Sequence, residues 1–325
     1  MNKTLACIAV IGLGNIAIRH RRNLKHLFPD ARVLAVSSSG RVPDELPENA
    51  DEVLPSIANL PIEKVDFAIV ASPAPFHWEH SKALMAANIP LLVEKPLSAE
   101  TEDALQFLEL AKAYSSPLGV GYCLRYLPSA QKVKEIVDSG ILGPIVTVNA
   151  EVGQYLPNWR QSKSYLDSVS ASKKLGGGAL LELSHELDYL LWLFGDLTFE
   201  YGRLSSSKRL SLEVEEVADV WLSSAIAPTI ILHQDFLQQQ GKRTCTIIAE
   251  DGRLEWDLMQ NSVSWYVEEQ ELNQVRFDGW DYNNMYLDMI TKLLDDSSPG
   301  PACASISEGL ATVRLINDIK QHSKQ

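Results

Sequence analysis

The feature that most constrains the fold is a glycine loop that directly follows a short apolar run near the N-terminus. Residues 5–11 are apolar, as in a strand buried on both faces, and residues 12–17 read Gly-Leu-Gly-Asn-Ile-Ala before a stretch with helical spacing. Strand, Gly-x-Gly-x-x-Gly/Ala loop and helix in this order are the fingerprint of a dinucleotide-binding unit. Gly12 permits the tight turn, Gly14 lets a pyrophosphate approach the backbone, and Ala17 allows close packing of helix on strand.

The helix that this loop opens has an N-terminus with free N–H groups and the positive end of a helix dipole. We therefore expect the phosphates of a dinucleotide to bind at this point of the chain. The candidate cofactor-binding residues of the loop are Gly12, Gly14, Asn15 and Ile16.

The end of the second predicted strand bears on which nicotinamide cofactor is preferred. NAD-dependent enzymes place an acidic residue about twenty residues beyond the loop, on the ribose 2′-hydroxyl. Here residues 36–41 read Val-Ser-Ser-Ser-Gly-Arg, and the first acid is Asp44. Serines and an arginine suit a 2′-phosphate, so we expect Ser38, Ser39 and Arg41 to favour NADP. A solvated loop that accepts NAD equally is the alternative. Two basic residues that could assist electrostatically are Arg19 and Arg22.

The distribution of apolar runs predicts two domains. Strands and helices alternate in the first third of the chain, which indicates a doubly wound parallel sheet. Later, a helix is predicted over residues 180–194, and strand-like segments follow one another from 199 to 275. Consecutive strands with short connections indicate a large mixed or antiparallel open sheet, with helices on one face. We predict an α/β Rossmann domain over residues 1–121 and an α+β substrate-binding and oligomerisation domain over residues 122–325.

Composition excludes several partners. The formal net charge is −13, with 29 Lys and Arg against 42 Asp and Glu, whereas a nucleic-acid-binding surface is basic. Four cysteines lie far apart without a Cys-x-x-Cys pair, so we expect neither a disulfide framework nor structural zinc, and a reducing compartment fits. No apolar run approaches the roughly 18 residues needed to span a bilayer. We expect a soluble, cytoplasmic protein without nucleic acid, membrane or metal partners.

Two further motifs follow predicted strands. Ser72-Pro73 leads to His77, and Glu94-Lys95-Pro96 ends the next strand. With the glycine loop, in this order and spacing, these motifs resemble the glucose–fructose oxidoreductase / inositol 2-dehydrogenase (Gfo/Idh/MocA) family. Three more segments resemble the domain junction, the start of the substrate-site helix and the terminal helix of that family. They are residues 121–128, 176–180 and 308–310.

The resemblance implies roles for individual residues. Lys95 would lie beside the nicotinamide and the reacting carbon, where an ammonium can hold a substrate hydroxyl and stabilise developing oxyanion character. The cofactor-binding residues that the resemblance adds are Ser72, Pro73, His77, Glu94 and Lys95 itself. The substrate-binding residues that it adds at the domain junction are Tyr122 and Arg125.

The resemblance also points to His185 as the proton acceptor, and this residue also counts among the substrate-binding candidates. Histidine has an ordinary pKa near neutrality and can accept a hydroxyl proton as hydride departs. The family pattern places Asp four residues before this His, whereas here Glu182 lies three residues before it. On a continuous helix the two spacings differ in phase by roughly 100°. We expect Glu182 to hold or tune His185, with Glu186 or Tyr122 as the next candidates for the proton.

Trp159 and Arg160 precede the triple glycine at residues 176–178. They could form a lid, with an aromatic face for a sugar ring and a guanidinium fork for an anionic group. An ordinary loop tryptophan that anchors the fold is the alternative.

These observations favour an NAD(P)-dependent dehydrogenase or reductase acting on CH–OH groups of a sugar, a polyol or a nucleotide-linked sugar. Two alternatives from other classes stay open. One is a glycoside-cleaving enzyme that uses bound NAD transiently, and the other is a non-enzymatic sensor that keeps the nucleotide fold. The strands between 199 and 275 have few helices to cover both faces of their sheet, so we expect a homodimer or a homotetramer built from dimers.

Overall fold

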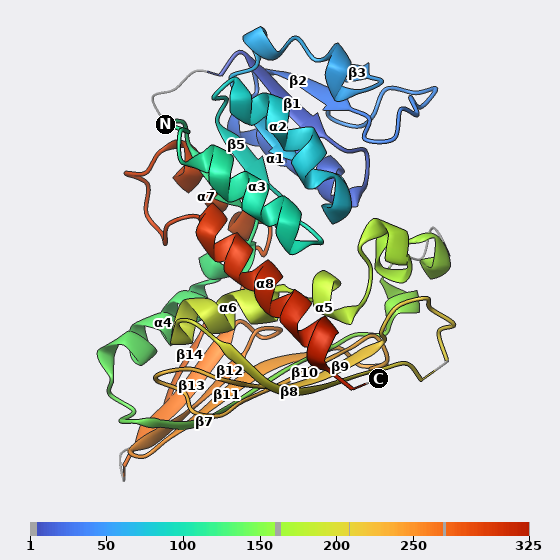
Figure 1. Ribbon diagram of the computed structural model, residues 1–325. Helices are drawn as coiled ribbons and strands as arrows, with labels where there is room; N and C mark the ends of the chain where they lie inside the picture. The colour runs from blue at the N-terminus through green and yellow to red at the C-terminus, as the bar shows by residue number, and fades with distance from the viewer. Residues whose placement is uncertain (1–4, 160–163, 208, 269–270, 325) are drawn as a thin grey trace. The chain divides into compact units, whose positions relative to one another are not determined.

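The computed structural model describes the chain over residues 5–159, 164–207, 209–268 and 271–324. The chain divides into two compact units (Figure 1). Unit 1 comprises Met1–Cys123 and Asn283–Val313, and unit 2 comprises Leu124–Tyr282 and Arg314–Gln325. The sequence-based division assigned everything after residue 121 to the second domain, whereas the structure groups residues 283–313 with unit 1.

Residues 283–313 belong to unit 1 because their apolar side chains complete its core. The Val120 N–H donates to the Ala304 carbonyl at 2.8 Å, and Leu310 and Val313 lie in the same buried cluster as the strands of the unit. These contacts join segments almost two hundred residues apart, so no local pattern in the sequence marks them.

Unit 1 is built on a six-stranded parallel sheet, sheet A, in the order β3-β2-β1-β4-β5-β6. This is the order of the doubly wound dinucleotide-binding fold. The strands are β1 (Cys7–Ile11), β2 (Arg32–Val36), β3 (Glu52–Leu54), β4 (Phe67–Val70), β5 (Leu91–Val93) and β6 (Leu118–Val120). Strands β1, β4 and β5 are buried on both faces, which explains their continuous apolar runs.

The helices of unit 1 pack against sheet A and against one another. They are α1 (Asn15–Leu27), α2 (His77–Ala86), α3 (Thr101–Ala111) and α7 (Asn284–Leu294). Helix α8 (Ile306–His322) begins in unit 1, and its last turns belong to unit 2. Helix α7 docks on α1 through two amides, because Asn283 and Asn23 each donate to the other, at 2.9 and 3.3 Å.

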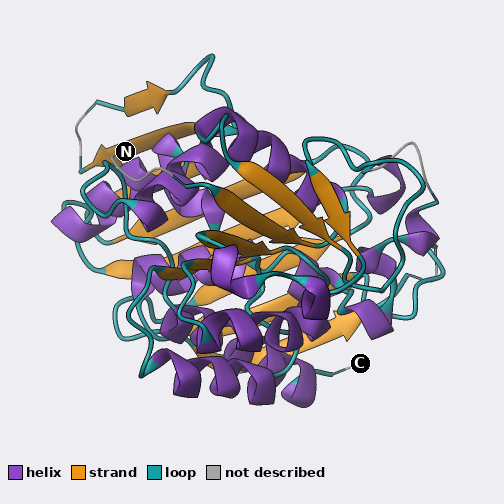
Figure 2. Cartoon of the chain, turned by 90° about the horizontal axis from the view of Figure 1, so that it is seen from above, coloured by secondary structure: helices purple, strands orange, loops and turns teal. Residues whose placement is uncertain are grey.

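Unit 2 contains an eight-stranded sheet, sheet B, in the order β14-β13-β12-β11-β7-β10-β9-β8. Strands β7 and β10 are parallel and the other neighbours are antiparallel, so the sheet is mixed. The strands are β7 (Ile145–Gly153), β8 (Thr198–Ser205), β9 (Val217–Ser223), β10 (Ile230–Asp235), β11 (Lys242–Ala249), β12 (Gly252–Asp257), β13 (Ser262–Val267) and β14 (Asn273–Arg276). Figure 2 shows the strands of both sheets in orange.

Helices cover one face of sheet B (Figure 1). Helix α4 (Pro128–Ser139) accepts a hydrogen bond at Ser129 from the indole of Trp256 on β12, at 2.8 Å. The Tyr189 ring of α6 (His185–Phe194) packs edge-on against the same indole at 5.0 Å. Burial alternates along the strands, as expected of a sheet with one covered face. The predicted fold class, a Rossmann domain plus a domain with a large mixed sheet and helices on one face, is confirmed.

The single helix expected over residues 180–194 is two helices, so that prediction is wrong. Helix α5 is Ala179–Glu182 and helix α6 is His185–Phe194. Glu182 therefore ends one helix and His185 begins the next. The comparison of helical phase between these two side chains does not apply to a broken helix.

The break follows from a contact with sheet B. The carbonyl of Leu183 accepts a hydrogen bond from the side chain of Gln234 on β10 at 2.7 Å, and a second from the Glu186 N–H at 3.3 Å. Gln234 is buried, so its amide requires a partner. The helix is interrupted where this carbonyl is aimed at the sheet. Of the helices in the described residues, none has the length and apolar character to cross a membrane.

Candidate functional site

The glycine loop lies at the carboxyl end of β1, and its two glycines serve different needs. Gly12 has φ +124°, and a Cβ there would lie 2.5 Å from the carbonyl oxygen of Ala71. Only glycine fits this position. Gly14 has an extended conformation and directly precedes α1, and a Cβ there would meet no atom within 4 Å. Open space therefore lies beside the backbone at the helix N-terminus.

This arrangement fits the phosphates of a dinucleotide. Among the described residues, no side chain caps α1 and no acid occupies its first turn, so its N–H groups and dipole remain available to an anion. Asn15 is exposed and Ile16 is half-buried, while Ala17 is fully buried against the sheet.

The loop after β2 holds the residues expected to choose between NAD and NADP. Ser37 is buried and its hydroxyl accepts from the Ser39 N–H at 3.4 Å. Ser38 is half-buried, and Ser39 and Arg41 are exposed. The basic residues expected to assist electrostatically contact α7 and its N-cap. Arg19 lies over the ring of Tyr286 at 4.8 Å, and Arg22 donates to Asn283 at 3.5 Å.

Arg21 is a residue whose part the sequence did not reveal. Its side chain is fully buried, and it donates to the carbonyls of Glu48 at 2.9 Å and Gly12 at 3.3 Å. Burial lowers the pKa of this guanidinium, against the nearby charge of Glu48. Arg21 thereby ties the loop after β2 to the glycine loop.

The Ser72-Pro73 segment follows β4 and is held by two histidines. The His77 ring is fully buried, with Nε2 2.7 Å from the Ser72 carbonyl and Nδ1 3.0 and 3.3 Å from the carbonyls of Pro96 and Leu97. Burial lowers the pKa of His77. His80 Nδ1 lies 2.9 Å from the Ser72 hydroxyl. His77 thus joins the segment after β4 to the turn after β5.

The turn after β5 carries Glu94, Lys95 and a cis peptide between Lys95 and Pro96. Glu94 Oε1 lies 2.6 Å from Nε2 of His20 on α1, and Glu94 Oε2 accepts from the Lys95 backbone N–H at 3.0 Å. Burial raises the pKa of Glu94, but the hydrogen bond and charge of His20 and the charge of Lys95 outweigh it, so the pKa lies below its ordinary value. Lys95 itself is half-buried.

In unit 2, His185 and Glu182 flank the helix break, and both are half-buried. Their α6 neighbours form buried ion pairs. Glu186 is paired with Arg243 through two hydrogen bonds of 2.6 and 3.0 Å. This side chain, an alternative candidate for the proton acceptor, is therefore already held in an ion pair.

Asp188 of α6 forms the second of these ion pairs. It accepts from Arg125 at 2.7 and 3.1 Å, and both side chains are buried. The predicted substrate residue Arg125 therefore also anchors α6. Tyr122, the other residue predicted from the domain junction, lies in the apolar core of unit 1.

Trp159 follows a short helical turn in unit 2 and is half-buried. Its ring packs edge-on against Phe236 at 5.6 Å, within a small apolar cluster. The Leu156 N–H donates to the Phe236 carbonyl at 3.0 Å, which fixes the start of this segment. Arg160, its predicted partner in a lid, lies outside the described residues.

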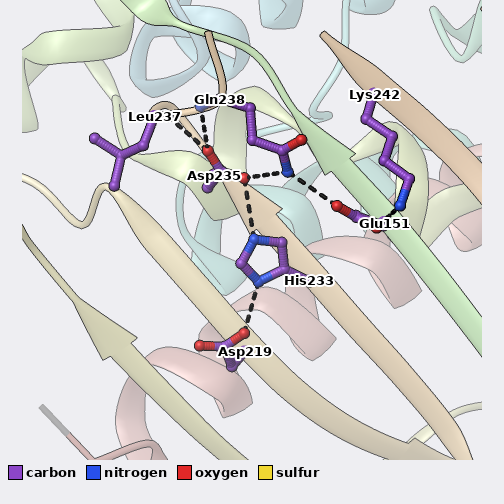
Figure 3. Close-up of polar contacts among 7 residues, drawn as sticks. All are labelled: Glu151, Asp219, His233, Asp235, Leu237, Gln238 and Lys242. Carbon is purple, nitrogen blue, oxygen red and sulfur yellow. Dashed lines mark hydrogen bonds and ion pairs between the residues drawn. The ribbon is translucent and has the colours of Figure 1, made fainter. Parts of the chain in front are cut away.

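Figure 3 shows a polar cluster on adjacent strands of sheet B that the sequence analysis missed. His233 on β10 lies between two carboxylates, 2.7 Å from Asp219 on β9 and 3.0 Å from Asp235. The hydrogen bond to Asp235 raises the pKa of His233, and the hydrogen bond and charge of Asp219 add to this effect. Burial acts in the opposite direction, and the resulting pKa is about 9. Asp219 and His233 occupy non-core positions of their strands. Strand alternation could have signalled that much, but the pairing of the two residues needs the register.

The cluster continues across the sheet to two more strands (Figure 3). Asp235 accepts from the backbone N–H groups of Leu237 at 2.6 Å and Gln238 at 2.9 Å. The Gln238 amide bridges Asp235 and Glu151, at 2.8 and 3.0 Å, and Lys242 donates to Glu151 at 2.6 Å. Asp235 thereby fixes the turn that follows β10.

Sheet A, with its strand order and its glycine loop, defines a dinucleotide-binding protein of the Rossmann class. Residues 7–122 match the model of an oxidoreductase family with an NAD-binding Rossmann fold, and residues 130–255 match the Gfo/Idh/MocA C-terminal domain. The chain belongs to the Gfo/Idh/MocA family, so the family expected from the sequence motifs is confirmed.

Curated relatives align with part of the chain. It is 28% identical over 200 residues to an inositol 2-dehydrogenase of Streptomyces avermitilis, covering 58% of this chain and 53% of that protein. It is 27% identical over 196 residues to a D-glucoside 3-dehydrogenase of Escherichia coli, covering 58% and 54%. The chain spans about half the length of the curated relatives it matches.

Solved structures show the same fold over almost the whole chain. A UDP-N-acetylglucosamine 3-dehydrogenase from Acidithiobacillus ferrooxidans has a TM-score of 0.78 over 98% of both chains at 17% identity. A levoglucosan dehydrogenase in complex with NADH and levoglucosan has a TM-score of 0.80, over 97% of this chain and 96% of that chain, at 15% identity.

Proposed function

We propose that the protein is an NAD(P)-dependent oxidoreductase that transfers a hydride to or from a CH–OH carbon of a sugar, a polyol or a nucleotide-linked sugar. One observation carries the proposal. Lys95 follows β5 in the same parallel sheet whose β1 ends in the glycine loop, with β4 between them. Two strand spacings amount to about 10 Å, so one ligand at this edge of the sheet can contact both. The names of the relatives, which include dehydrogenases of inositol and D-glucosides, support the substrate class.

When bound, a nicotinamide cofactor accepts or donates the hydride. The residues of this chain bind the cofactor, orient the substrate and exchange its proton. The first turn of α1 holds the phosphates, and Ser72, Pro73 and Glu94 shape the strand ends beside them. Lys95 orients and polarises the reacting oxygen. His185 takes or returns its proton, and Glu182 supports His185.

The substrate-side residues in this proposal are Tyr122, Arg125, Trp159, Arg160 and His185. Arg125 acts through the position of α6, and Trp159 offers a ring face to a sugar. None of the four cysteines, which all lie in the described part of the chain, forms a disulfide. This is typical of a reducing compartment, so we place the activity in the cytoplasm.

The decisive experiment is turnover of NAD(P)H or NAD(P)+ against a panel of sugars, polyols and nucleotide-linked sugars, with mass analysis of the products. We expect stoichiometric oxidation or reduction of one compound class. Release of a sugar or an aglycone without net change in the cofactor would indicate a glycoside-cleaving enzyme instead. Binding without any conversion would indicate a sensor.

A further inference from the structure

We propose that His20 and Glu94 form a positioning pair that fixes the backbone and the electrostatic environment of Lys95, and so connects the phosphate-binding helix α1 to the catalytic end of β5. The kinetic part of this inference rests on the proposed function. The structural part concerns residues of unit 1 alone.

The geometry of the pair leaves little freedom. His20 is fully buried and Glu94 is 5% exposed. The two oxygens of Glu94 have different partners, since Oε1 lies 2.6 Å from His20 Nε2 and Oε2 accepts from the Lys95 N–H at 3.0 Å. A change in the direction of the Glu94 carboxylate therefore changes the hydrogen bond of the Lys95 peptide directly.

The surroundings are shaped to hold this carboxylate in place. A Cβ at Gly121 would lie 3.1 Å from the carboxyl atoms of Glu94, so the strand end beside it leaves room for the side chain and no more. The Tyr286 ring of α7 packs edge-on against His20 at 5.9 Å, and Arg19 covers that ring at 4.8 Å.

The charge of the pair also matters for Lys95. An ionised carboxylate is costly to bury without partners. Here burial raises the pKa of Glu94. The hydrogen bond and charge of His20, together with the charge of Lys95, lower it by more, so the pKa lies below its ordinary value. Glu94 therefore carries a negative charge at neutral pH, one residue from the ammonium that the proposed reaction uses.

The pair also links two parts of the site. His20 lies on α1, little more than one turn beyond Asn15, where the helix N-terminus faces the open space at Gly14. A nucleotide that binds at this N-terminus and a substrate that contacts Lys95 are thus held by one short rigid connection. Positional errors of about 1 Å at a reacting group can cost 10²-fold in rate, so the connection has a kinetic consequence.

Three variants test the pair. Glu94→Gln removes the charge and keeps the shape, His20→Leu removes the ring nitrogens and fills the volume, and His20→Gln keeps a hydrogen-bond donor. We expect Glu94→Gln and His20→Leu to lower kcat by about tenfold or more. For His20→Leu, whose side chain is not among the predicted cofactor-binding residues, the dissociation constant for NAD(P) should change by no more than about twofold. His20→Gln restores most of the loss. The double variant His20→Leu/Glu94→Gln loses no more than the worse single variant, because the two residues act as a unit.

Tyr114→Phe provides the matched control in the same unit. The Tyr114 hydroxyl donates to the Ile89 carbonyl at the opposite end of β5 from Glu94, so its loss lowers stability without touching the pair. Thermal unfolding of all variants separates the two effects. Equal kcat losses at equal stability losses in Tyr114→Phe and His20→Leu, or additive losses in the double variant, would overturn the proposal.

A second readout requires no substrate. The rate at which an amine-selective reagent labels Lys95, followed by mass spectrometry of its peptide, reports on the charge beside its ammonium. We expect faster labelling in Glu94→Gln than in the wild type, because the neutral amide no longer stabilises the ammonium. We expect a changed rate in His20→Leu, where Glu94 loses its partner, and an unchanged rate in Tyr114→Phe. Unchanged labelling in all variants overturns the pair. Absence of turnover with altered labelling refutes the proposed function and leaves the pair standing.

Discussion

At the scale of residues, substitutions at the two glycines of the loop are expected to have different effects, one on stability and the other on cofactor binding. Gly12 is needed by the protein itself, because its φ is +124° and a Cβ would meet Ala71. The protein itself does not require glycine at position 14, because the space beside it is empty of protein atoms, and we predict that a bound pyrophosphate requires it. The sequence predicts a tight turn at Gly12 and the approach of a pyrophosphate at Gly14, and both roles stay predictions that variants can test.

Gly14→Val is therefore expected to abolish binding of NAD(P) while the protein unfolds at nearly the wild-type temperature. Gly14→Ala should show a smaller loss of affinity, and Gly12→Ala should lower stability by about 1 to 3 kcal/mol. Calorimetric titration with the cofactor and thermal unfolding measure the two effects. Unchanged affinity in Gly14→Val would remove the phosphates from this loop.

The residues of the loop after β2 are expected to favour NADP over NAD. Ser38→Asp should shift the preference toward NAD, because a carboxylate repels the 2′-phosphate and accepts from a ribose hydroxyl. Ser38→Asn is the neutral control of similar size. Dissociation constants for both cofactors test this, and a wild-type preference for NAD of tenfold, or about 1.4 kcal/mol, would contradict it.

Removal of the groups assigned to the chemical step should affect turnover far more than cofactor binding. Lys95→Ala and His185→Ala are each expected to lose about 10² to 10⁴ in kcat, and Glu182→Gln should lose less because it removes a supporting charge. The substrate identified in the panel provides the assay. Near-normal turnover in His185→Ala beside an inactive Lys95→Ala would assign the proton to another residue, and Glu186 is already held by Arg243.

At the scale of elements, most helices and strands could be predicted because their patterns are local. The apolar patterns predict a helix over residues 306–322 and a strand over residues 262–267, and these are the bounds of α8 and β13. The broken helix could not be predicted, because apolar residues continue across residues 180–194 and the cause of the break, Gln234, comes from a strand some fifty residues later. Strands β3 and β6 have three residues each, which is too short for a periodic pattern.

The contribution of His233, which joins β9 to β10, to the stability of the folded state depends on pH. The pKa of His233 is raised to about 9, above its ordinary value near 6.5. The charged groups around it are Asp219, Asp235, Glu151 and Lys242 (Figure 3). Since the folded state favours the protonated form, this stabilisation is fully present below about pH 6.5 and is lost as the pH rises through about 9.

His233→Gln should therefore lower the free energy of unfolding by about 1 kcal/mol at pH 6, a discounted value for a partly exposed side chain. At pH 10 the variant and the wild type should be equally stable. Urea unfolding at several pH values measures this, with the exposed His26→Gln as control. A stability difference that does not vary with pH would mean that His233 contributes packing rather than charge.

At the scale of the whole molecule, the face of sheet B opposite its helices is the expected contact between subunits. Large aromatic side chains of β8 and β9 remain exposed and contact each other there, with the rings of Tyr201 and Trp221 5.8 Å apart and each about 40% exposed. Such a face suits an isologous contact. The sequence predicted an open sheet from the strand-rich region, but not which strands present these rings.

We propose a homodimer, or a tetramer built from dimers, through this face. Trp221→Glu is expected to shift the protein toward the monomer in multi-angle light scattering at micromolar concentration, whereas a charge at the exposed Leu105 of α3 in unit 1 should not. A wild-type monomer under these conditions would exclude the contact.

Because residues 283–313 belong to unit 1, the core of this unit can be completed only late in the synthesis of the chain. Strand β6 and the rest of sheet A leave the ribosome long before Ala304, Leu310 and Val313, which complete their core. At 5–20 residues per second, translation of residues 124–282 takes roughly 10 to 30 s. During that interval the apolar surface around Val120 lacks its cover. We infer that the Rossmann core stays incomplete until the last part of the chain has been synthesised. A chaperone that binds exposed apolar segments can bind the nascent chain during this interval.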